Sequence, residues 1–275
     1  MISVDLVVGP NDSGGLFQME RLIVGLLFLI TGQSMKRQSK KLALYALQRA
    51  NRFWKRPNWK NMRTIAPLSR SFGLDRGQAI DRYYIEKFLS QNASHIKGNV
   101  LEVAENTYTK QFGRDVQKSD VLHISEDAPG ATIIGDLCDL STLPENAFDC
   151  FICTQTYNFI YDFQSAIRGT RYLLRNGGIV LATVAGISQI SRYDMDRWGD
   201  FWRFTTLSVA KIFSEQFGEA NVQVSSFGNV LTSIGFLEGL SAGELSSEEL
   251  EYNDPDYQLL ITVVAKKNPP QRDER

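Results

Sequence analysis

Short, continuously apolar runs recur along the middle of this chain at fairly regular distances. They comprise residues 98–104, 121–124, 131–134, 148–153 and 178–184. Each run has the length and the unbroken apolar character of a strand that is buried on both faces. Helix-length segments separate most of the runs, and this rhythm predicts an open parallel α/β sheet. Such sheets bind ligands at the carboxyl ends of their strands.

Amphipathic and apolar patterns on both sides of this region predict further elements. These are helices over residues 80–92 and 207–217 and strands over residues 222–226 and 257–265. In the first helix, Ile80, Tyr84 and Phe88 lie on one face. The predicted organisation is an N-terminal basic helical arm over residues 1–63, a single α/β domain over 64–267 and a disordered tail over 268–275.

The net charge of −1 conceals a strong asymmetry along the chain. Residues 21–74 contain twelve Lys or Arg and no Asp or Glu, so the rest of the chain is acidic. A basic arm on an acidic body predicts an anionic partner surface for the arm. The acidic body argues against nucleic acid as a partner, because it would repel phosphate groups.

The arm has the composition of a helix that lies at a membrane surface. The apolar run 22–30 is about nine residues long, well short of the roughly 20 that span a bilayer. A basic amphipathic segment follows, with Trp54 and Trp59 around Lys55 and Arg56. We therefore expect a cytoplasmic protein whose arm contacts the anionic inner face of the membrane. The alternative is a helix that packs on the domain with its charges in solvent.

The three cysteines predict buried thiols rather than a metal site. Cys150 and Cys153 lie in one predicted strand, where alternation directs them to opposite faces. Cys138 and two histidines do not complete a recognisable ligand spacing, so no metal is expected. Small buried residues in a reducing compartment are the simplest interpretation.

The turn after the first strand, Ala104-Glu-Asn-Thr-Tyr108, excludes one class of cofactor. A dinucleotide-binding turn has the spacing Gly-x-Gly-x-x-Gly, because glycine lets the backbone approach a pyrophosphate. No glycine is present, and Glu105 would repel phosphate, so the turn argues against NAD and FAD. It tolerates a cofactor without phosphate, such as S-adenosylmethionine. Asn106 can still adopt a left-handed conformation there.

Polar side chains end the following strands. His123 lies 21 residues after Glu102, where a ribose-binding group is expected. Asp136 ends the third strand, where its carboxylate can accept a hydrogen bond from an adenine amino group. Thr154 ends the fourth strand.

With these residues in place, the chain resembles the class I S-adenosylmethionine-dependent methyltransferases of the broad group called type 11. The resemblance covers about residues 75–266, and its motifs are residues 101–104, 135–144, 148–149 and 174–178. They match the family's strand–acid–glycine turn, Gly-Asp to Leu-Pro segment, Phe-Asp pair and Leu-x-Pro-Gly-Gly turn. Ala104 and Tyr108 stand where the family has glycines, and Asn176 stands where it has proline.

The resemblance implies a Rossmann-like fold: a mostly parallel seven-stranded sheet flanked by helices, with an N-terminal helical extension. It implies a methyltransferase that uses S-adenosylmethionine. The cofactor-binding residues that it implies are Arg76, Glu102, Ala104, Glu105, His123, Asp136, Leu137 and Thr154.

Residues 75–84 and 191–205 resemble a bacterial subgroup associated with glycan and cell-surface polysaccharide assembly, which implies O-methylation of a sugar or glycan-like acceptor. Aromatic and charged residues alternate in 191–205, and aromatic faces beside Arg and Asp suit sugar rings. The expected acceptor-binding residues are Trp198, Trp202 and Arg203, and the expected catalytic residues are Asp194, Asp196 and Tyr157.

Three alternatives remain open at this point. The loop 191–205 can be a surface loop whose tryptophans pack inward and whose aspartates pair with neighbouring arginines. The altered glycine turn can mark a degenerate methyltransferase fold that serves as a binding or scaffold module. A short-chain NAD(P) reductase is a third, because Tyr83 and Lys87 have the spacing of its catalytic pair, but they precede the first core strand.

Overall fold

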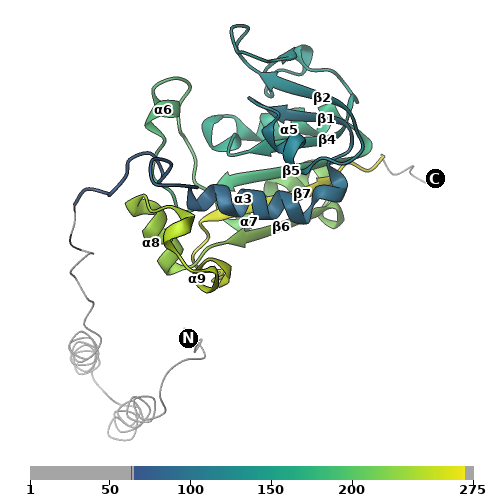
Figure 1. Cartoon of the computed structure of the whole chain (residues 1–275). Helices are drawn as coiled ribbons and strands as arrows, with labels where there is room; N and C mark the ends of the chain where they lie inside the picture. Colours follow the sequence, from purple (N-terminus) through teal and green to yellow (C-terminus); the bar gives the residue numbers. More distant parts are fainter. Residues whose placement is uncertain (1–62, 64, 270–275) are drawn as a thin grey trace, which may run out of the picture. The chain divides into compact units, whose positions relative to one another are not determined.

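The computed structural model describes residues 63 and 65–269, which form an α/β domain around a seven-stranded sheet (Figure 1). The strands are β1 (Gly98–Val103), β2 (Val116–His123), β3 (Ile133–Ile134), β4 (Phe148–Thr154), β5 (Leu174–Ala185), β6 (Val222–Phe227) and β7 (Leu260–Lys266). The helices are α3 (Ile80–Gln91), α4 (Thr107–Phe112), α5 (Phe163–Leu173), α6 (Arg192–Met195), α7 (Thr206–Phe217), α8 (Val230–Glu238) and α9 (Ser247–Glu251).

The strand order is β3-β2-β1-β4-β5-β7-β6. Strands β1 to β5 are parallel, and β7 lies antiparallel between β5 and β6. The predicted Rossmann-like, mostly parallel sheet is therefore confirmed. Because the chain leaves β1 toward β2 and β3 and returns to β4 on the other side, the order reverses between β1 and β4. In sheets of this kind the ligand crevice lies at that reversal, beyond the carboxyl ends of the strands.

Both faces of the sheet are buried, as the continuous apolar runs predicted. Val100 and Cys150 pack in the cluster that contains the buried face of α3. Their neighbours Leu101 and Phe151 pack in the cluster that contains α5 and α7. Cys153 joins this second cluster, so the expected placement of Cys150 and Cys153 on opposite faces is confirmed. Burial raises the pKa of both thiols, that of Cys153 to about 12, which keeps them protonated.

Helix α3 covers its face of the sheet with the residues that the sequence placed on one stripe. Ile80, Tyr84 and Phe88 are buried, together with Ile85 and Leu89. The Tyr84 hydroxyl donates a hydrogen bond to the Leu250 carbonyl oxygen, so the one polar atom of this stripe has a partner (2.9 Å). The helix ends just before β1, and it therefore runs from the carboxyl edge of the sheet toward the amino edge.

The structure differs from the predicted elements in several places. Strand β2 begins at Val116, earlier than the predicted run. The apolar pattern did not reveal this first half, because it is polar and partly exposed. Strand β5 begins at Leu174 within a predicted turn, since Leu174 pairs with Phe148 before the register shifts. Helices α8 and α9 were not predicted. Both are short, and each begins at a capping box, Asn229 with Thr232 and Ser246 with Glu249.

Several predictions concern residues outside the described part of the chain. The basic arm, apart from its last residue Arg63, and most of the predicted tail lie there, so both remain predictions. Within residues 65–269, no helix is long and apolar enough to cross a membrane.

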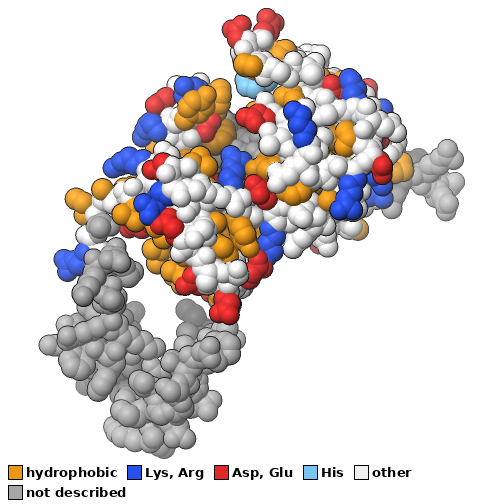
Figure 2. Space-filling view, in the orientation of Figure 1, with side chains coloured by type: hydrophobic (Ala, Val, Ile, Leu, Met, Phe, Trp, Pro, Cys, Tyr) orange, Lys and Arg blue, Asp and Glu red, His pale blue; other side chains and the backbone are white. Residues whose placement is uncertain are grey.

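Helix α8 keeps an apolar outer face. Its inner residue Phe236 is buried, but Val230, Leu231, Ile234 and Leu237 are 38–47% exposed. Figure 2 shows apolar side chains over α8 on this side of the domain. Exposed apolar residues on one helix face are more than the scattered single residues that any protein surface carries.

We expect Gly169→Ala to destabilise the domain. Gly169 lies in α5, and a Cβ there would meet the Leu137 carbonyl oxygen at 2.0 Å. Overpacking of this kind costs about 1–3 kcal/mol of unfolding free energy, although alanine favours helices. Urea unfolding measures the effect. Gly243→Ala, where an added Cβ meets nothing within 4 Å, is the matched control. Equal stability of the two variants would contradict the close packing of α5.

Candidate active site

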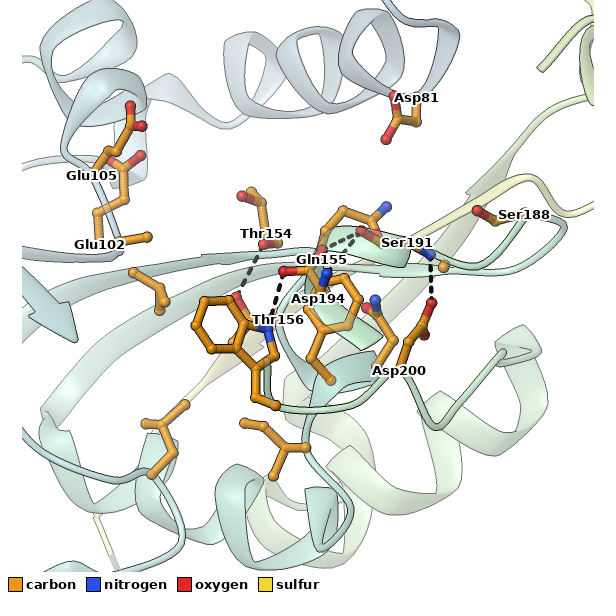
Figure 3. A pocket seen from close by; sticks show the side chains of 18 of the residues that line it. Asp81, Glu102, Glu105, Thr154, Gln155, Thr156, Ser188, Ser191, Asp194 and Asp200 are labelled. Atoms are coloured by element: carbon orange, nitrogen blue, oxygen red, sulfur yellow. Dashed lines mark hydrogen bonds between the residues drawn. The ribbon is translucent and has the colours of Figure 1, made fainter. Parts of the chain in front are cut away.

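A cavity of about 960 Å³ opens at the carboxyl edge of the parallel strands. The ends of β1 to β5, the first turns of α3 and the loop 186–205 after β5 contribute its walls. Small-molecule sites occupy roughly 300–1,000 Å³, so this cavity lies at the upper end of that range. Figure 3 shows polar side chains from β1, β4, α3 and the loop around the open space.

The Glu102 carboxylate ties the end of β1 to the start of α4. It accepts hydrogen bonds from the Tyr108 N–H (3.1 Å) and from the N–H and hydroxyl of Thr109 (2.8 Å each). The first N–H groups of a helix have no partner within the helix, so this carboxylate caps α4. Burial raises the pKa of Glu102, and the hydrogen bonds from Thr109 and Tyr108 oppose that rise. Glu102 lines the cavity, as expected of a cofactor residue, but three of its acceptor positions serve the turn.

The residue that takes the left-handed conformation in this turn is Ala104, with φ of +68°. Asn106, which the sequence indicated could adopt that conformation, has φ of −116°. The structure corrects this, because the left-handed residue is the one directly after the strand, where the family has its first glycine. Both Ala104 and Glu105 line the cavity.

The ends of β2 and β3 supply the other expected cofactor groups. The His123 Nδ1 accepts a hydrogen bond from the Ser125 N–H (2.9 Å), so the neutral ring carries its proton on Nε2. His123 lines the cavity, and this N–H can donate to a hydroxyl. Asp136 Oδ1 accepts from the Cys138 N–H (2.8 Å). Asp136 and Leu137 also line the cavity, next to His123 in the sheet.

The end of β4 carries a strained residue that the sequence did not single out. Gln155, directly after the expected cofactor residue Thr154, has φ of +49°. Its N–H donates to the Thr183 carbonyl oxygen of β5 (2.9 Å), which holds this backbone in place. Non-glycine residues in left-handed conformations gather at ligand sites, where neighbouring structure stabilises them. Both Thr154 and Gln155 line the cavity.

The loop 186–205 is held over the cavity by its own hydrogen bonds. The Asp194 carboxylate accepts from the Ser191 hydroxyl and from the Trp198 Nε1–H (3.0 Å). The buried Asp200 carboxylate accepts from the Ser191 N–H (2.8 Å) and pairs with both terminal nitrogens of Arg203 (2.6 and 2.9 Å). All five residues line the cavity. The expected acceptor residue Arg203 also donates to backbone carbonyl oxygens of Ser188 and Gln189, so it acts here mainly as a clamp on the loop.

Trp198 stands between the two groups of expected residues. Its indole is 44% exposed and meets the His123 ring edge-on, with centroids 6.5 Å apart. An expected acceptor-binding residue from the loop after β5 therefore borders the expected ribose group at the end of β2. Sequence patterns could not predict this contact, because the two residues are far apart along the chain.

Two expected catalytic residues lie away from the cavity lining, and the structure corrects both. Tyr157 is 1% exposed, and its hydroxyl hydrogen-bonds the Thr170 hydroxyl in the core (2.6 Å). Burial raises the pKa of Tyr157 well above its ordinary value, so its hydroxyl stays protonated and does not serve as a base. Asp196 is exposed on the outer side of the loop and pairs with Arg192 (3.5 Å). Asp194 is the one of the three expected catalytic residues that lines the cavity.

Two expected binding residues are also corrected. Arg76 forms a bidentate ion pair with Glu244, and its hydrogen bonds lower the pKa of that carboxyl to about 2. Trp202 packs its ring against Phe163 (5.3 Å between centroids) and donates its Nε1–H to the Tyr161 carbonyl oxygen. Neither side chain belongs to the described lining of the cavity.

Four polar residues stand out among the cavity residues that sequence reasoning missed. They are Asp81 and Arg82 at the start of α3, Gln155, and Asn158, which is 2% exposed. The Asn158 Oδ1 is buried without a hydrogen-bond partner in the described structure, so a ligand donor would satisfy it. Asp81 and Arg82 lie within the segment 75–84 that resembles the glycan-associated subgroup. The cofactor-binding residue predicted in that segment was Arg76.

The cavity is strongly acidic. Its described lining contains eight carboxylates and two guanidinium groups. Arg203 is paired with Asp200, and Arg82 lies beside Asp81 and donates to the Tyr108 hydroxyl (3.1 Å). A cavity of this charge attracts cationic ligands and disfavours phosphorylated ones.

Residues 95–182 match the family model described as a methyltransferase domain. Comparison with curated proteins gives no match. Among solved structures, a SAM-dependent methyltransferase from Archaeoglobus fulgidus is 13% identical, with a TM-score of 0.45, over 68% of this chain and 94% of that one. One from Mesorhizobium loti is 15% identical, with a TM-score of 0.44, over 71% and 100%. A putative methyltransferase from Haloferax volcanii, in complex with the activator Trm112, is 12% identical, with a TM-score of 0.47, over 72% and 95%.

The matched residues contain β1 to β4 and most of β5, with the turn after β1 and the ends of β2 and β3. The match to a methyltransferase domain supports the expected enzyme class, an S-adenosylmethionine-dependent methyltransferase, and the expected cofactor, S-adenosylmethionine. The cavity fits the cofactor on three observations: the left-handed Ala104, the free Nε2–H of His123 and the acidic lining, which suits a sulfonium cation. None of these features needs a phosphate group on the ligand.

We expect Ala104→Gly to stabilise the domain by up to about 1 kcal/mol. A left-handed alanine costs about 1–2 kcal/mol, and glycine relieves it at an entropic cost of about 0.4–1 kcal/mol. Calorimetry should show equal or tighter binding of S-adenosylmethionine. Ala131→Gly, outside the left-handed region, is the control and should lose stability. Much weaker cofactor binding by Ala104→Gly would show that the alanine methyl group itself contacts the cofactor.

Proposed function

We propose that this enzyme transfers the methyl group of S-adenosylmethionine to a hydroxyl of an uncharged, polyhydroxylated acceptor such as a sugar or glycan. The observation that carries the proposal is the Asp194–Trp198 pair at the cavity (3.0 Å). A carboxylate held beside an exposed aromatic face provides both a hydrogen-bond acceptor for a sugar hydroxyl and a surface for the sugar ring.

The cavity divides between the two ligands along the sheet. The groups at the ends of β1, β2 and β3, which include Ala104, His123 and Asp136, suit the adenosine of the cofactor. The groups beyond β4 and β5, which include Asn158 and Asp194, are left for the acceptor. Trp198 borders both regions.

Asp194 is the proposed proton acceptor for the reacting hydroxyl. Bound S-adenosylmethionine supplies an already activated methyl group, so the chain's main tasks are orientation and proton removal. The Ser191 hydroxyl and the Trp198 Nε1–H fix the orientation of the Asp194 carboxylate. A carboxylate can accept about four hydrogen bonds, so these two leave acceptor positions for the substrate.

The charges of the cavity favour an acceptor without phosphate. Arg203 is held by Asp200 and by backbone carbonyl oxygens, and most of the remaining charged groups are carboxylates. A phosphate group next to these carboxylates would be repelled. Hydroxyl and amide groups, by contrast, match the free side-chain oxygen of Asn158.

The alternatives are less well supported by the geometry. In the reductase alternative, Tyr83 and Lys87 would be catalytic, but both bind Glu251. The scaffold alternative drew on the missing glycine, and Ala104 takes the glycine conformation nonetheless. Contact of the basic arm with an anionic membrane, from the cytoplasmic side, remains a proposal from the sequence.

A panel of acceptors tests the proposed substrate class. We expect S-adenosylhomocysteine to form from S-adenosylmethionine when neutral methyl hexosides and deoxyhexosides are supplied, and to form at background rates with hexose phosphates. Primary alkylamines at equal concentration distinguish O- from N-methylation. Turnover with amines or phosphates but none with glycosides would contradict the proposal.

The two aspartates of the loop form a matched pair for the proton acceptor. With an acceptor from the panel, Asp194→Asn should lower turnover about 10²–10⁴-fold, as loss of a general base does. Asp196→Asn, at the exposed residue that directly follows α6, should leave turnover unchanged. Calorimetry should show that both variants keep their affinity for S-adenosylmethionine. Equal turnover of the two variants would remove Asp194 from this role.

A further inference from the structure

We propose that Asp81 and Arg82, neighbours at the start of α3, form a clamp for the amino-acid end of S-adenosylmethionine. Asp81 would accept hydrogen bonds from the cofactor's ammonium group, and Arg82 would donate to its carboxylate. The inference rests on the methyltransferase function for the identity of the cofactor, and it is independent of the acceptor.

The first turn of α3 lies at the ligand-binding edge of the sheet. The helix runs from the carboxyl edge toward the amino edge, and Asp81 is its second residue. Both Asp81 and Arg82 line the cavity. In Figure 3, Asp81 hangs from α3 across the open space from Thr154 and Gln155, with Glu102 and Glu105 of the β1 turn to one side. An amino-acid group above the ends of β1 and β4 would lie within this space.

Both side chains retain hydrogen-bonding capacity. Asp81 Oδ1 accepts from the Arg82 N–H (2.8 Å), and its other oxygen has no hydrogen-bond partner among residues 65–269. Arg82 uses Nη1 to donate to the Tyr108 hydroxyl, and its other N–H groups make no hydrogen bond within the same residues. A free carboxylate oxygen beside a free guanidinium edge is complementary to an ammonium beside a carboxylate.

Most of the backbone N–H groups in and just after the turn that follows β1 already donate hydrogen bonds within the protein, so few remain for an anionic ligand. The Ala104 N–H donates to the Leu122 carbonyl oxygen (3.0 Å), and the Glu105 N–H donates to that of Val103 (2.8 Å). The N–H groups of Tyr108 and Thr109 donate to Glu102. A carboxylate bound at this turn therefore needs a donor from elsewhere, and Arg82 is the cavity guanidinium that is not enclosed by an ion pair of its own.

The clamp is fixed to the turn by a chain of contacts. Glu102 holds the Tyr108 N–H at the end of β1, and the Tyr108 hydroxyl accepts from Arg82. Tyr108 thus positions the Arg82 guanidinium relative to the end of β1. Arg82→Lys would keep the charge but lose the planar edge that can bind Tyr108 and a carboxylate together.

Ligands that differ only in the amino-acid end test the clamp by binding alone. S-adenosylhomocysteine carries that end, and 5′-methylthioadenosine lacks it. Calorimetry should show that Asp81→Asn and Arg82→Gln each bind S-adenosylhomocysteine about 10–100-fold more weakly, the range for hydrogen bonds to charged groups. Binding of 5′-methylthioadenosine should change less than about twofold. Glu215→Gln, an exposed residue of α7 outside the described lining of the cavity, is the control and should bind both ligands as the unaltered protein does.

Decarboxylated S-adenosylmethionine separates the two residues and needs no variant of Asp81. The unaltered protein should bind it at least tenfold more weakly than S-adenosylmethionine, and Arg82→Gln should abolish that preference. Unchanged binding of S-adenosylhomocysteine by both variants, or an equal loss for 5′-methylthioadenosine, would overturn the clamp. Failure of the unaltered protein to bind S-adenosylhomocysteine at all would instead overturn the cofactor assignment on which the proposed function stands.

Discussion

The buried carboxylate of Glu102 connects the end of β1 to the first turn of α4 and, through Tyr108, to Arg82 of α3. It sits at the end of β1, next to the point where the strand order reverses, and it accepts three hydrogen bonds from the first turn of α4. These bonds satisfy helix N–H groups that would otherwise lack a partner, so they stabilise the short helix. They also fix the turn in which Ala104 is left-handed and place Tyr108 where it meets Arg82. Loss of this carboxylate would therefore release the turn, the helix and the guanidinium together.

The loop after β5 is a second, separate unit of organisation. Its hydrogen bonds are mostly internal: Ser191 with Asp194 and Asp200, and Asp200 with Arg203. The Arg203 guanidinium also binds carbonyl oxygens of the same loop, which compensates the burial of the Asp200 carboxylate. A loop with its own ion pair can keep its shape over an open cavity. It can therefore present Asp194 and Trp198 from a defined position rather than from a mobile segment.

Charge and strain in the cavity are consistent with one kind of chemistry. Left-handed residues follow both β1 and β4, at Ala104 and Gln155, and each is held by a backbone bond to a neighbouring strand. The acidic lining attracts a cationic cofactor and disfavours phosphate. An enzyme that transfers an activated methyl group needs such a pre-formed, orienting site more than it needs a strong nucleophile of its own.

The sequence located most of the strands, because strands that are buried on both faces are largely apolar. It also located the ends of β1 to β4, and hence Glu102, His123, Asp136 and Thr154 at one edge, since parallel strands place their carboxyl ends together. Short helices with little apolar periodicity, such as α8 and α9, were beyond its reach.

Tertiary structure decided which side chains of the marked segments face the cavity. In the segment 75–84, Arg76 forms an ion pair with Glu244 and does not line the cavity, while Asp81 and Arg82 do. In the loop 191–205, Asp194 and Asp196 are two residues apart, yet one lines the cavity and the other faces solvent. The local sequence does not predict which side chains line the cavity, because the cavity is formed by segments that are distant along the chain. The physical reason is that burial and pairing depend on where the whole fold brings the chain, whereas strand periodicity depends on neighbouring residues alone.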